Sequence, residues 1–350
     1  MNELNKTSEQ TGGPSGPFFS IIIPVYNAAA YIQECIESIL AQDFDDWEAI
    51  LVDDVSSDRS VEKAEEFSRK DARIKVFRSE TNSGGPHTPR MHAASLAKGK
   101  YVVPIDADDK VSADLLSILY QSIQSSDADM VIPEMWRWNG TTAYKILPLE
   151  KIDTTKIWMG KDLVEHTLCQ WAIPMAGFAV RRDIYLNSDH MLTKDDRRSS
   201  FVDELLSRWL LFMCGSVGMC NARYYYRQNE ESITNVNVAR FTKSRLILSN
   251  SLIDMTARSF GENSHTHLRA LENKFSSAVD LLRLINRSAM SRTERTSLVD
   301  QISESMRGFD LSRIKGRVSP RYLAVMRLPI PIARIAFKIL DPIIKLKNGI

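Results

Sequence analysis

The sequence predicts an α/β protein, with a mostly parallel sheet flanked by helices and a helical C-terminal extension. Apolar, strand-like runs alternate with amphipathic segments over residues 18–133, and from about Asn237 the pattern is helical to the end of the chain. Parallel strands need crossover connections, so such alternation is typical of a sheet covered by helices on both faces. With 350 residues, the chain is long enough to bury a sizeable core.

The predicted strands are short apolar runs that end in polar turns. The first run covers residues 18–25 and ends in Pro24-Val25-Tyr26-Asn27. Continuous apolar character over this length is typical of a buried strand. Further strands are predicted at residues 47–53, 73–77, 101–105 and 129–133.

Helices are predicted between these strands. After Asn27, apolar side chains recur at helical spacing and form one apolar face, at Ile32, Cys35, Ile36, Ile39 and Leu40. The next helices are expected to start near Arg59 and to cover residues 87–97 and 113–123. Beyond Trp136 the alternation stops, and the region contains several Trp residues without a regular period.

Composition limits the classes of function. Lys and Arg number 45 against 44 Asp and Glu, and a net charge of +1 provides no overall field to attract nucleic acid. The four Cys residues form no CxxC pair, which favours a reducing compartment. Residues 1–17 are rich in Ser, Thr, Gly and Pro and predict a flexible segment without a secretory signal. We therefore expect a cytoplasmic protein that can meet a membrane only at its surface.

Acidic side chains follow two of the predicted strands. Asp106-Ala107-Asp108-Asp109 comes directly after residues 101–105, and Asp53-Asp54 ends an earlier strand. Ligands of such sheets bind at the carboxyl ends of the strands, and Mg²⁺ or Mn²⁺ prefers oxygen ligands. A cation and nucleoside site is one interpretation. The alternative is that these carboxylates only form turns and cap the helices that follow.

Three segments together resemble family 2 glycosyltransferases, which have the GT-A fold. Residues 20–27 (SIIIPVYN) look like the opening strand of that family, and residues 51–58 (LVDDVSSD) look like its nucleoside-binding turn. Residues 105–109 (IDADD) look like its metal-binding DxD segment. The order and spacing of the three agree, and the resemblance extends over roughly residues 18–232.

The resemblance implies a donor site for a nucleoside-diphosphate sugar. Pro24 and Tyr26 match the loop that borders the base, and Asp54 matches the acid that hydrogen-bonds the base in relatives that use UDP-sugars. Arg90 matches an arginine near the nucleotide, and Asp106 matches a ribose contact. Val55 stands where relatives usually have glycine.

The resemblance also implies a divalent metal cofactor, Mg²⁺ or Mn²⁺, and a catalytic base. Asp108 would contact the metal-bound diphosphate, and Asp109 would be an alternate ligand. Asp203 resembles the aspartate of the Glu-Asp segment that acts as base. Val202 replaces the usual glutamate, and Glu204 leaves the assignment open by one position.

The changes of pattern near Trp136 and Asn237 divide the chain at residues 135/136 and 236/237. Residues 18–135 would bind the nucleotide sugar, residues 136–236 would hold the acceptor and the base, and residues 237–350 would form the helical region. The segment Tyr224-Tyr225-Tyr226-Arg227 with Ser232 resembles the closing segment of relatives from polysaccharide pathways. Its alternative reading is a set of core aromatics with one solvated arginine.

The expected function is an inverting transfer of a sugar, with a UDP-sugar as the expected donor, to a hydroxyl of a glycan or lipid-linked acceptor in bacterial polysaccharide synthesis. Two rivals stay open. One is an inactive scaffold that retains the sheet. The other is a sugar nucleotidyltransferase, which would need a Gly-rich basic loop after the first strand, where this chain has Val25-Tyr26-Asn27-Ala28-Ala29.

The C-terminal segment carries an apolar stripe at helical spacing together with basic residues. The stripe comprises Ile332, Ile335, Ala336, Ile339, Leu340 and Ile343, and the basic residues include Arg334, Lys338 and Lys345. A basic amphipathic helix of this kind can lie on the anionic inner face of a membrane. The alternative is a final helix that packs on the core of the protein.

Overall fold

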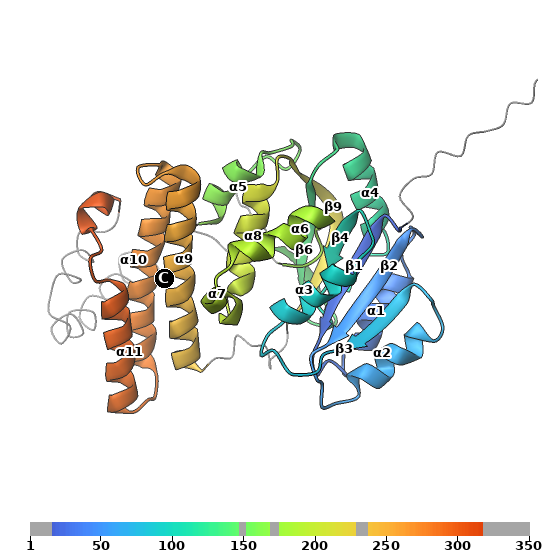
Figure 1. Ribbon diagram of the computed structural model, residues 1–350, viewed down its shortest axis with the longest axis horizontal. Helices are drawn as coiled ribbons and strands as arrows, with labels where there is room; N and C mark the ends of the chain where they lie inside the picture. Colours follow the sequence, from blue (N-terminus) through green and yellow to red (C-terminus); the bar gives the residue numbers. More distant parts are fainter. Residues whose placement is uncertain (1–15, 147–151, 169–174, 229–236, 318–350) are drawn as a thin grey trace, which may run out of the picture.

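The computed structural model describes residues 16–146, 152–168, 175–228 and 237–317. A curled sheet with its covering helices forms one end of the molecule, and the helices α9, α10 and α11 form the other end (Figure 1). The predicted α/β part and the predicted helical region are therefore both present. The C-terminal stripe at residues 332–345 lies outside the described residues.

The first four strands form a parallel half-sheet in the order β3-β2-β1-β4. They are β1 (Phe19–Val25), β2 (Trp47–Asp53), β3 (Ile74–Arg78) and β4 (Tyr101–Pro104). Every residue of β1 and β2 is buried, which explains why their sequences are almost continuously apolar. All four strands lie where the sequence predicts them.

Beyond β4 the sheet is mixed. Strand β8 (Ala179–Arg181) pairs antiparallel with β4 on one side and with β6 (Met130–Trp138) on the other. The strand predicted at 129–133 is therefore present as β6, but β8 separates it from β4. The remaining strands are β9 (Val217–Arg227), parallel to β6, and β5 (Lys110–Val111) and β7 (Ala143–Ile146), which pair antiparallel with β9 and β6. The irregular sequence after Trp136 carries no periodic signal for this insertion.

Two hydrophobic clusters cover the two faces of the sheet. Alternate residues of a strand point to opposite faces, so Ile22 belongs to one cluster while Ile21 and Ile23 belong to the other. The Ile22 cluster packs against α3 (His87–Leu96), α5 (Gly160–Thr167), α6 (Arg182–Ser188) and α8 (Val202–Met213). The opposite cluster packs against α1 (Ile32–Leu40), α2 (Ser60–Ser68) and α4 (Leu115–Ser126). Helices therefore cover both faces, as predicted.

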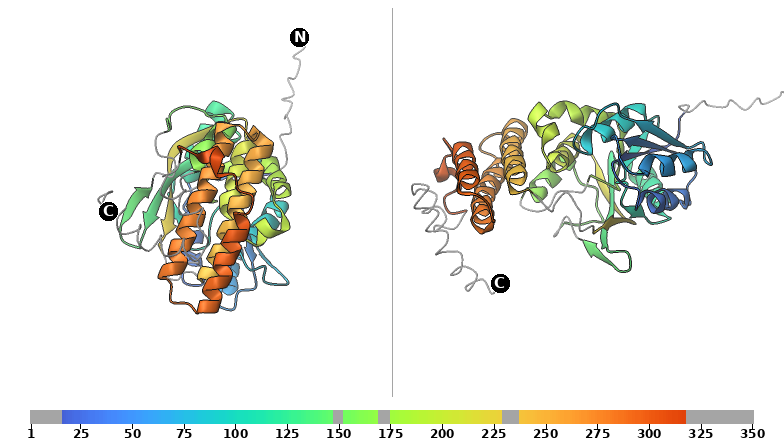
Figure 2. Two further views of the ribbon diagram at one scale, coloured as in Figure 1. Left: turned by 90° about the vertical axis from the view of Figure 1, so that its left-hand side faces the viewer. Right: turned by 90° about the horizontal axis from the view of Figure 1, so that it is seen from below.

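The C-terminal helices form a small antiparallel bundle, which Figure 2 shows from two further sides. They are α9 (Val238–Phe260), α10 (His265–Arg287) and α11 (Arg292–Ser305), and the Asn237, Ser264 and Ser291 side chains cap them. Their shared core includes Phe275 and Ile285. None of the helices in the described ranges is both long enough and apolar enough to cross a bilayer.

Candidate active site

Arg90 joins two carboxylates that are far apart in the sequence. From helix α3, its guanidinium donates to Asp106 Oδ1 at 2.7 Å and to Asp203 Oδ1 at 2.8 Å. Asp106 follows the carboxyl end of β4, whereas Asp203 lies in the first turn of α8. Three segments of the chain thus meet at one edge of the sheet, where such sheets bind ligands.

This group is buried on the Arg90 side and open on the carboxylate side. The Arg90 side chain is 1% exposed, while those of Asp106 and Asp203 are 32% and 35% exposed. Burial by itself disfavours the charged guanidinium, but Asp203 and Asp106 outweigh it and raise the pKa of Arg90. Arg90 therefore stays cationic and presents both carboxylates to solvent from a fixed position.

Two further buried side chains border Arg90. His87 Nε2 lies 2.9 Å from Asp189 Oδ1, and burial lowers the pKa of His87 despite this acidic neighbour. Burial also disfavours the charged form of Tyr185 and therefore raises its pKa; its hydroxyl interacts electrostatically with Arg90. Within the described residues, His87 Nδ1, Arg90 Nε and Tyr185 Oη have no hydrogen-bond partner. No sequence motif pointed to Tyr185, and the isolated His87 carried no expectation.

The acidic turn after β4 is anchored by β9. Tyr224 Oη donates to Asp109 Oδ2 at 2.6 Å and accepts from the Asp106 amide at 3.2 Å, while the Arg227 amide donates to Asp109 Oδ1 at 2.7 Å. Burial and then the charges of Asp108 and Asp106 raise the pKa of Asp109 well above its usual range. A negative charge on Asp109 is therefore disfavoured in this turn unless a bound cation compensates it.

Helix capping does not explain this turn. The chain passes from Asp109 into β5 (Lys110–Val111), and α4 begins only at Leu115, after Asp114. Asp108 offers the hard oxygen ligands that Mg²⁺ and Mn²⁺ prefer, whereas Asp109 is 1% exposed and both of its oxygens accept from β9. Mg²⁺ commonly uses only one or two carboxylates beside substrate phosphates. Among the described residues, no group of three or more His, Cys, Asp or Glu side chains is placed to hold a metal ion. The turn fits an open site of that kind.

The position of Tyr224 depends on a glycine. Gly177 has φ +81°, and a Cβ atom there would lie 2.6 Å from Cδ2 of the Tyr224 ring. Its amide also donates to the Pro104 carbonyl at 2.7 Å, just before the acidic turn. Only a residue without a side chain fits between β4 and Tyr224.

The turn after β2 holds Asp54 against the loop before α3. The Asp54 carboxylate accepts from the Ser83 amide at 3.0 Å and from Ser83 Oγ at 2.9 Å. Asp53, in contrast, accepts from the Ser56 amide within its own turn at 3.1 Å. Tyr26 is 56% exposed beside this turn, and Pro24 is buried in β1. The turn-forming role applies to Asp53, while Asp54 connects two loops.

Val55 has a backbone conformation that β-branched residues avoid. Its φ is +63°, in the left-handed region, which costs an L-residue about 1–2 kcal/mol. Val55→Gly is expected to stabilise the fold by about 1 kcal/mol, since part of the gain is offset by the greater freedom of glycine in the unfolded chain. The denaturant midpoint measures this effect. Val55→Ala should gain less stability than Val55→Gly. A glycine variant that is less stable than the unmodified chain would show that the Val55 backbone is not strained.

Comparisons with known proteins agree on one family. The profile of "Glycosyl transferase family 2" matches residues 20–191. The uncharacterized glycosyltransferase EpsJ of Bacillus subtilis is 39% identical over 227 residues, which cover 63% of this chain and 64% of that protein. Glycosyltransferase GlyG of Streptococcus pneumoniae is 39% identical over 120 residues, 34% of this chain and 40% of that protein.

Residues 20–191 form a glycosyltransferase family 2 domain. The matched parts span 19 to 64% of the length of the first three curated relatives. Residues 1–349 of Staphylococcus aureus TarS, solved in complex with UDP-GlcNAc, superpose with a TM-score of 0.67 at 20% identity and cover 95% of this chain and 92% of that one. A mannosyltransferase from Pyrobaculum calidifontis, in complex with GDP-Man and Mn²⁺, gives a TM-score of 0.51 at 14% identity over 93% and 87% of the chains. These likenesses confirm the GT-A fold.

In this chain, Arg227 is not a solvated arginine. Its guanidinium lies over the Trp138 ring at 4.1 Å, its Nη2 donates to Glu34 Oε2 at 2.5 Å, and its Nε donates to the Asp108 carbonyl at 2.7 Å. Its side chain is 11% exposed. The alternative interpretation, a solvated arginine, is therefore wrong for Arg227. Its side chain instead holds the acidic turn in place. Ser232 lies outside the described residues.

The two acidic residues at the start of α8 point to different partners. Glu204 lies 3.5 Å from Arg245 Nη1 and 3.6 Å from the buried Arg208, whereas Asp203 reaches Arg90. Asp203 therefore shares the Arg90 group with Asp106, and Glu204 belongs to the contact between α8 and α9.

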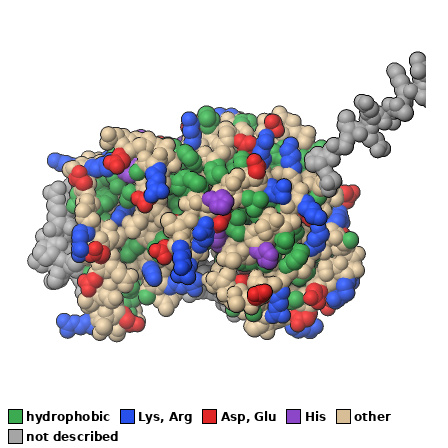
Figure 3. Space-filling model, viewed as in Figure 1, with side chains coloured by type: hydrophobic (Ala, Val, Ile, Leu, Met, Phe, Trp, Pro, Cys, Tyr) green, Lys and Arg blue, Asp and Glu red, His purple; other side chains and the backbone are tan. Residues whose placement is uncertain are grey.

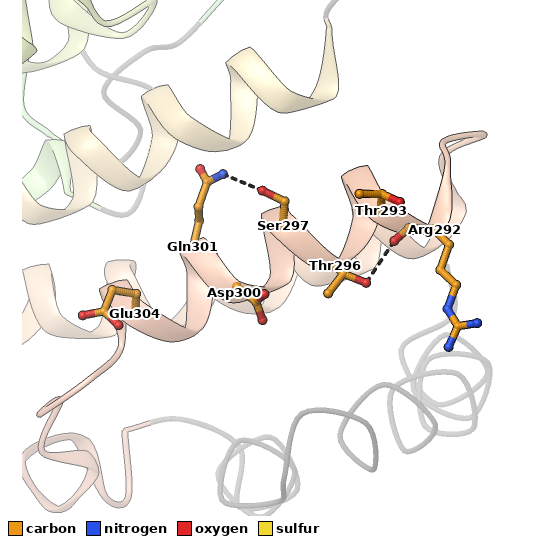
Figure 4. A pocket seen from close by; sticks show the side chains of 7 residues that line it. All are labelled: Arg292, Thr293, Thr296, Ser297, Asp300, Gln301 and Glu304. Atoms are coloured by element: carbon orange, nitrogen blue, oxygen red, sulfur yellow. Dashed lines mark hydrogen bonds between the residues drawn. The ribbon is translucent and has the colours of Figure 1, made fainter.

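A polar hollow lies along α11, at the end of the molecule away from the sheet (Figures 1 and 4). Its lining side chains are Arg292, Thr293, Thr296, Ser297, Asp300, Gln301 and Glu304. All of them come from one helix, and the hollow plays no part in the site.

Proposed function

We propose that this chain is an inverting glycosyltransferase that moves a sugar from a nucleoside-diphosphate donor, with a UDP-sugar expected, to an acceptor hydroxyl. The observation that carries the proposal is the Arg90 bridge, which holds Asp106 of the donor side and Asp203 of the acceptor side in one group. Separate structural roles for these carboxylates would not require a shared buried cation. A scaffold would have no need for this arrangement.

The donor would lie across the carboxyl ends of β1, β2 and β4. Tyr26 offers an exposed ring at the base position, and Asp106 is available to ribose hydroxyls. Asp54 is 3% exposed and accepts from Ser83, so it would contact the base in place of that serine. Arg90 supplies a permanent positive charge near the place where the diphosphate becomes a leaving group. Asp108, with Asp109 as alternate ligand, would hold a divalent Mg²⁺ or Mn²⁺, which supplies further neutralisation of the diphosphate charge when bound.

Asp203 would act as the base. The acceptor hydroxyl forms the new bond to the anomeric carbon while the bond from that carbon to the diphosphate oxygen breaks. The electron pair leaves with the diphosphate, and the hydroxyl proton passes to the Asp203 carboxylate. Attack from the face opposite the diphosphate inverts the anomeric centre in one displacement. The 35% exposure of Asp203 allows an acceptor to reach it.

The names of the relatives support a role in the synthesis of bacterial cell-surface polymers. They include a poly(ribitol-phosphate) beta-glucosyltransferase of Bacillus spizizenii, TarS of Staphylococcus aureus and a putative teichuronic acid biosynthesis glycosyltransferase of Bacillus subtilis. The proposed acceptor is accordingly a glycan or a lipid-linked glycan. The reaction is proposed to take place on the cytoplasmic side of the membrane.

A donor panel tests the proposal. UDP- and GDP-sugars are mixed with the full chain and Mg²⁺ or Mn²⁺, with and without cell-surface polymer fractions, and free nucleoside diphosphate is measured. Release that depends on an acceptor supports transfer. Binding of a nucleotide sugar without release under any condition would favour a scaffold, and release of pyrophosphate from a nucleoside triphosphate would favour a nucleotidyltransferase.

Removal of the divalent metal is expected to lower the transfer rate by about 10²-fold or more, because the leaving diphosphate loses its Lewis acid. The rate is measured after addition of excess chelator and again after Mg²⁺ or Mn²⁺ is restored. Circular dichroism of the same samples serves as a control for the fold. A rate that is unchanged in excess chelator would exclude the metal role of Asp108 and Asp109.

A further inference from the structure

A group of basic side chains that has no acidic partner among the described residues lies beside the candidate base. The group, called here the basic surface, consists of Lys194 and Arg198 on α7 (Lys194–Arg198) and Arg240 and Lys243 on α9. All four are exposed, and none forms an ion pair with the described residues. Figure 3 shows Lys and Arg side chains gathered over α7 and the adjoining start of α9.

The two pairs of cations lie on helices that contact each other. Lys194 and Arg198 are four residues apart on α7, and Arg240 and Lys243 are three apart on α9, so each pair shares one helix face. The segment just after α7 is joined to α9 by hydrogen bonds from the Ser200 amide to Ser244 Oγ at 3.1 Å and from Arg240 Nε to Ser200 Oγ at 3.0 Å. The one exposed carboxylate on α7 is Asp195.

The basic surface adjoins both halves of the candidate site. Ser200, which accepts from Arg240, is three residues before Asp203. On the other side, Arg240 Nη2 donates to the Gly84 carbonyl at 3.3 Å, and the preceding Ser83 holds Asp54. An acceptor whose hydroxyl approaches Asp203 from the start of α8 would therefore pass over these cations.

We propose that the basic surface binds the acceptor, and that the acceptor is an anionic chain that carries phosphate or carboxylate groups. The inference rests on the proposed function, because only a transferase needs an acceptor beside Asp203. A neutral glycan would gain nothing from four exposed cations that form no ion pair within the described part of the chain and that repel one another until an anion binds. Exposed cations of this kind attract a flexible anionic chain through charge and not through shape.

The test uses the full chain, and its probe is fluorescent inorganic polyphosphate. The double variant Arg198→Gln with Lys243→Gln removes two cations that contact no proposed donor or base residue. Lys70→Gln with Lys161→Gln is the matched control, since both residues are exposed and lie on other elements, near the end of α2 and on α5. Polyphosphate affinity is measured at several salt concentrations, beside neutral dextran and phosphatidylglycerol vesicles.

The expected result is that the unmodified chain binds polyphosphate but not dextran, with an affinity that falls as salt rises. The double variant should bind about ten-fold more weakly, while the control stays within about two-fold. Equal binding by the double variant and the control would overturn the proposal, as would a lack of preference for polyphosphate over dextran. If the double variant loses vesicle binding but keeps its polyphosphate binding, the basic surface binds a membrane, and the proposal is also overturned.

UDP binding by the same variants separates this inference from the proposed function. Both double variants should bind UDP as the unmodified chain does, because the substituted residues lie outside the donor site. If acceptor-dependent nucleotide release is found but polyphosphate does not bind, only the basic surface is refuted. If no release is found with any donor, the proposed function fails whatever the polyphosphate result.

Discussion

Asp203→Asn should lower the rate of sugar transfer by about 10²- to 10⁴-fold, the usual contribution of a general base. Asparagine has nearly the same shape as aspartate, and its carbonyl can still accept from Arg90, so the group should keep its geometry. What is lost is the capacity to take the acceptor proton. Single-turnover kinetics with a labelled donor measure the transfer rate, and calorimetry measures donor affinity, which should change little.

Glu204→Gln is the matched control for this prediction. Glu204 is the neighbouring acid, but it pairs with Arg245 and the buried Arg208 instead of Arg90. Its loss should lower stability slightly, since Arg208 loses its acidic partner, and should leave the rate of transfer close to normal. The opposite result, an active Asp203→Asn variant and an inactive Glu204→Gln variant, would move the base by one position.

Arg90→Met is expected to affect stability and activity together. It removes the cation between Asp106 and Asp203 and leaves two carboxylates facing each other. Breaking a buried ion pair costs about 3–5 kcal/mol. We expect about 2–4 kcal/mol here, because about a third of each carboxylate side chain is exposed to solvent. The expected fall in Tm is about 5–10 °C. Transfer should slow by about 10²-fold or more, because the leaving diphosphate loses a fixed charge.

A second variant separates the two effects of Arg90. Combining Arg90→Met with Asp203→Asn removes one of the opposed charges, so much of the lost stability should return while transfer stays abolished. Thermal unfolding and nucleotide release measure the two properties separately. If Arg90→Met alone keeps both the normal Tm and the normal rate, the bridge has neither role.

The sequence predicts the parts of the site that lie at strand ends. The positions of Asp54 and Asp106 follow from the apolar runs before them and from the carboxyl-end rule for parallel sheets. The approach of Asp203 to Arg90 does not follow from any local pattern. It depends on β8 entering between β4 and β6 and on α8 packing against one face of the sheet, which are long-range events without a sequence period.

The supporting side chains were harder to anticipate. Tyr185 and Tyr224 are ordinary aromatic residues in sequence, and only packing brings the hydroxyl of Tyr185 near Arg90 and that of Tyr224 to Asp109. The resemblance of the Tyr-Tyr-Tyr-Arg segment to the family drew attention to Tyr224, but it did not indicate that Tyr224 bonds to Asp109. Physical patterns predict secondary structure from neighbours along the chain, whereas these contacts join residues 95 and 115 positions apart.

The contact between Gly177 and Tyr224 has a consequence for natural variation. A methyl group at position 177 would push the Tyr224 ring, and this ring is hydrogen-bonded to both the Asp106 amide and the Asp109 carboxylate. The smallest possible mutation at a residue with no functional group would thus shift the carboxylates at which the cation is expected. Selection for activity should therefore keep position 177 invariant among orthologues that keep Tyr224, although Gly177 itself takes no part in the proposed reaction.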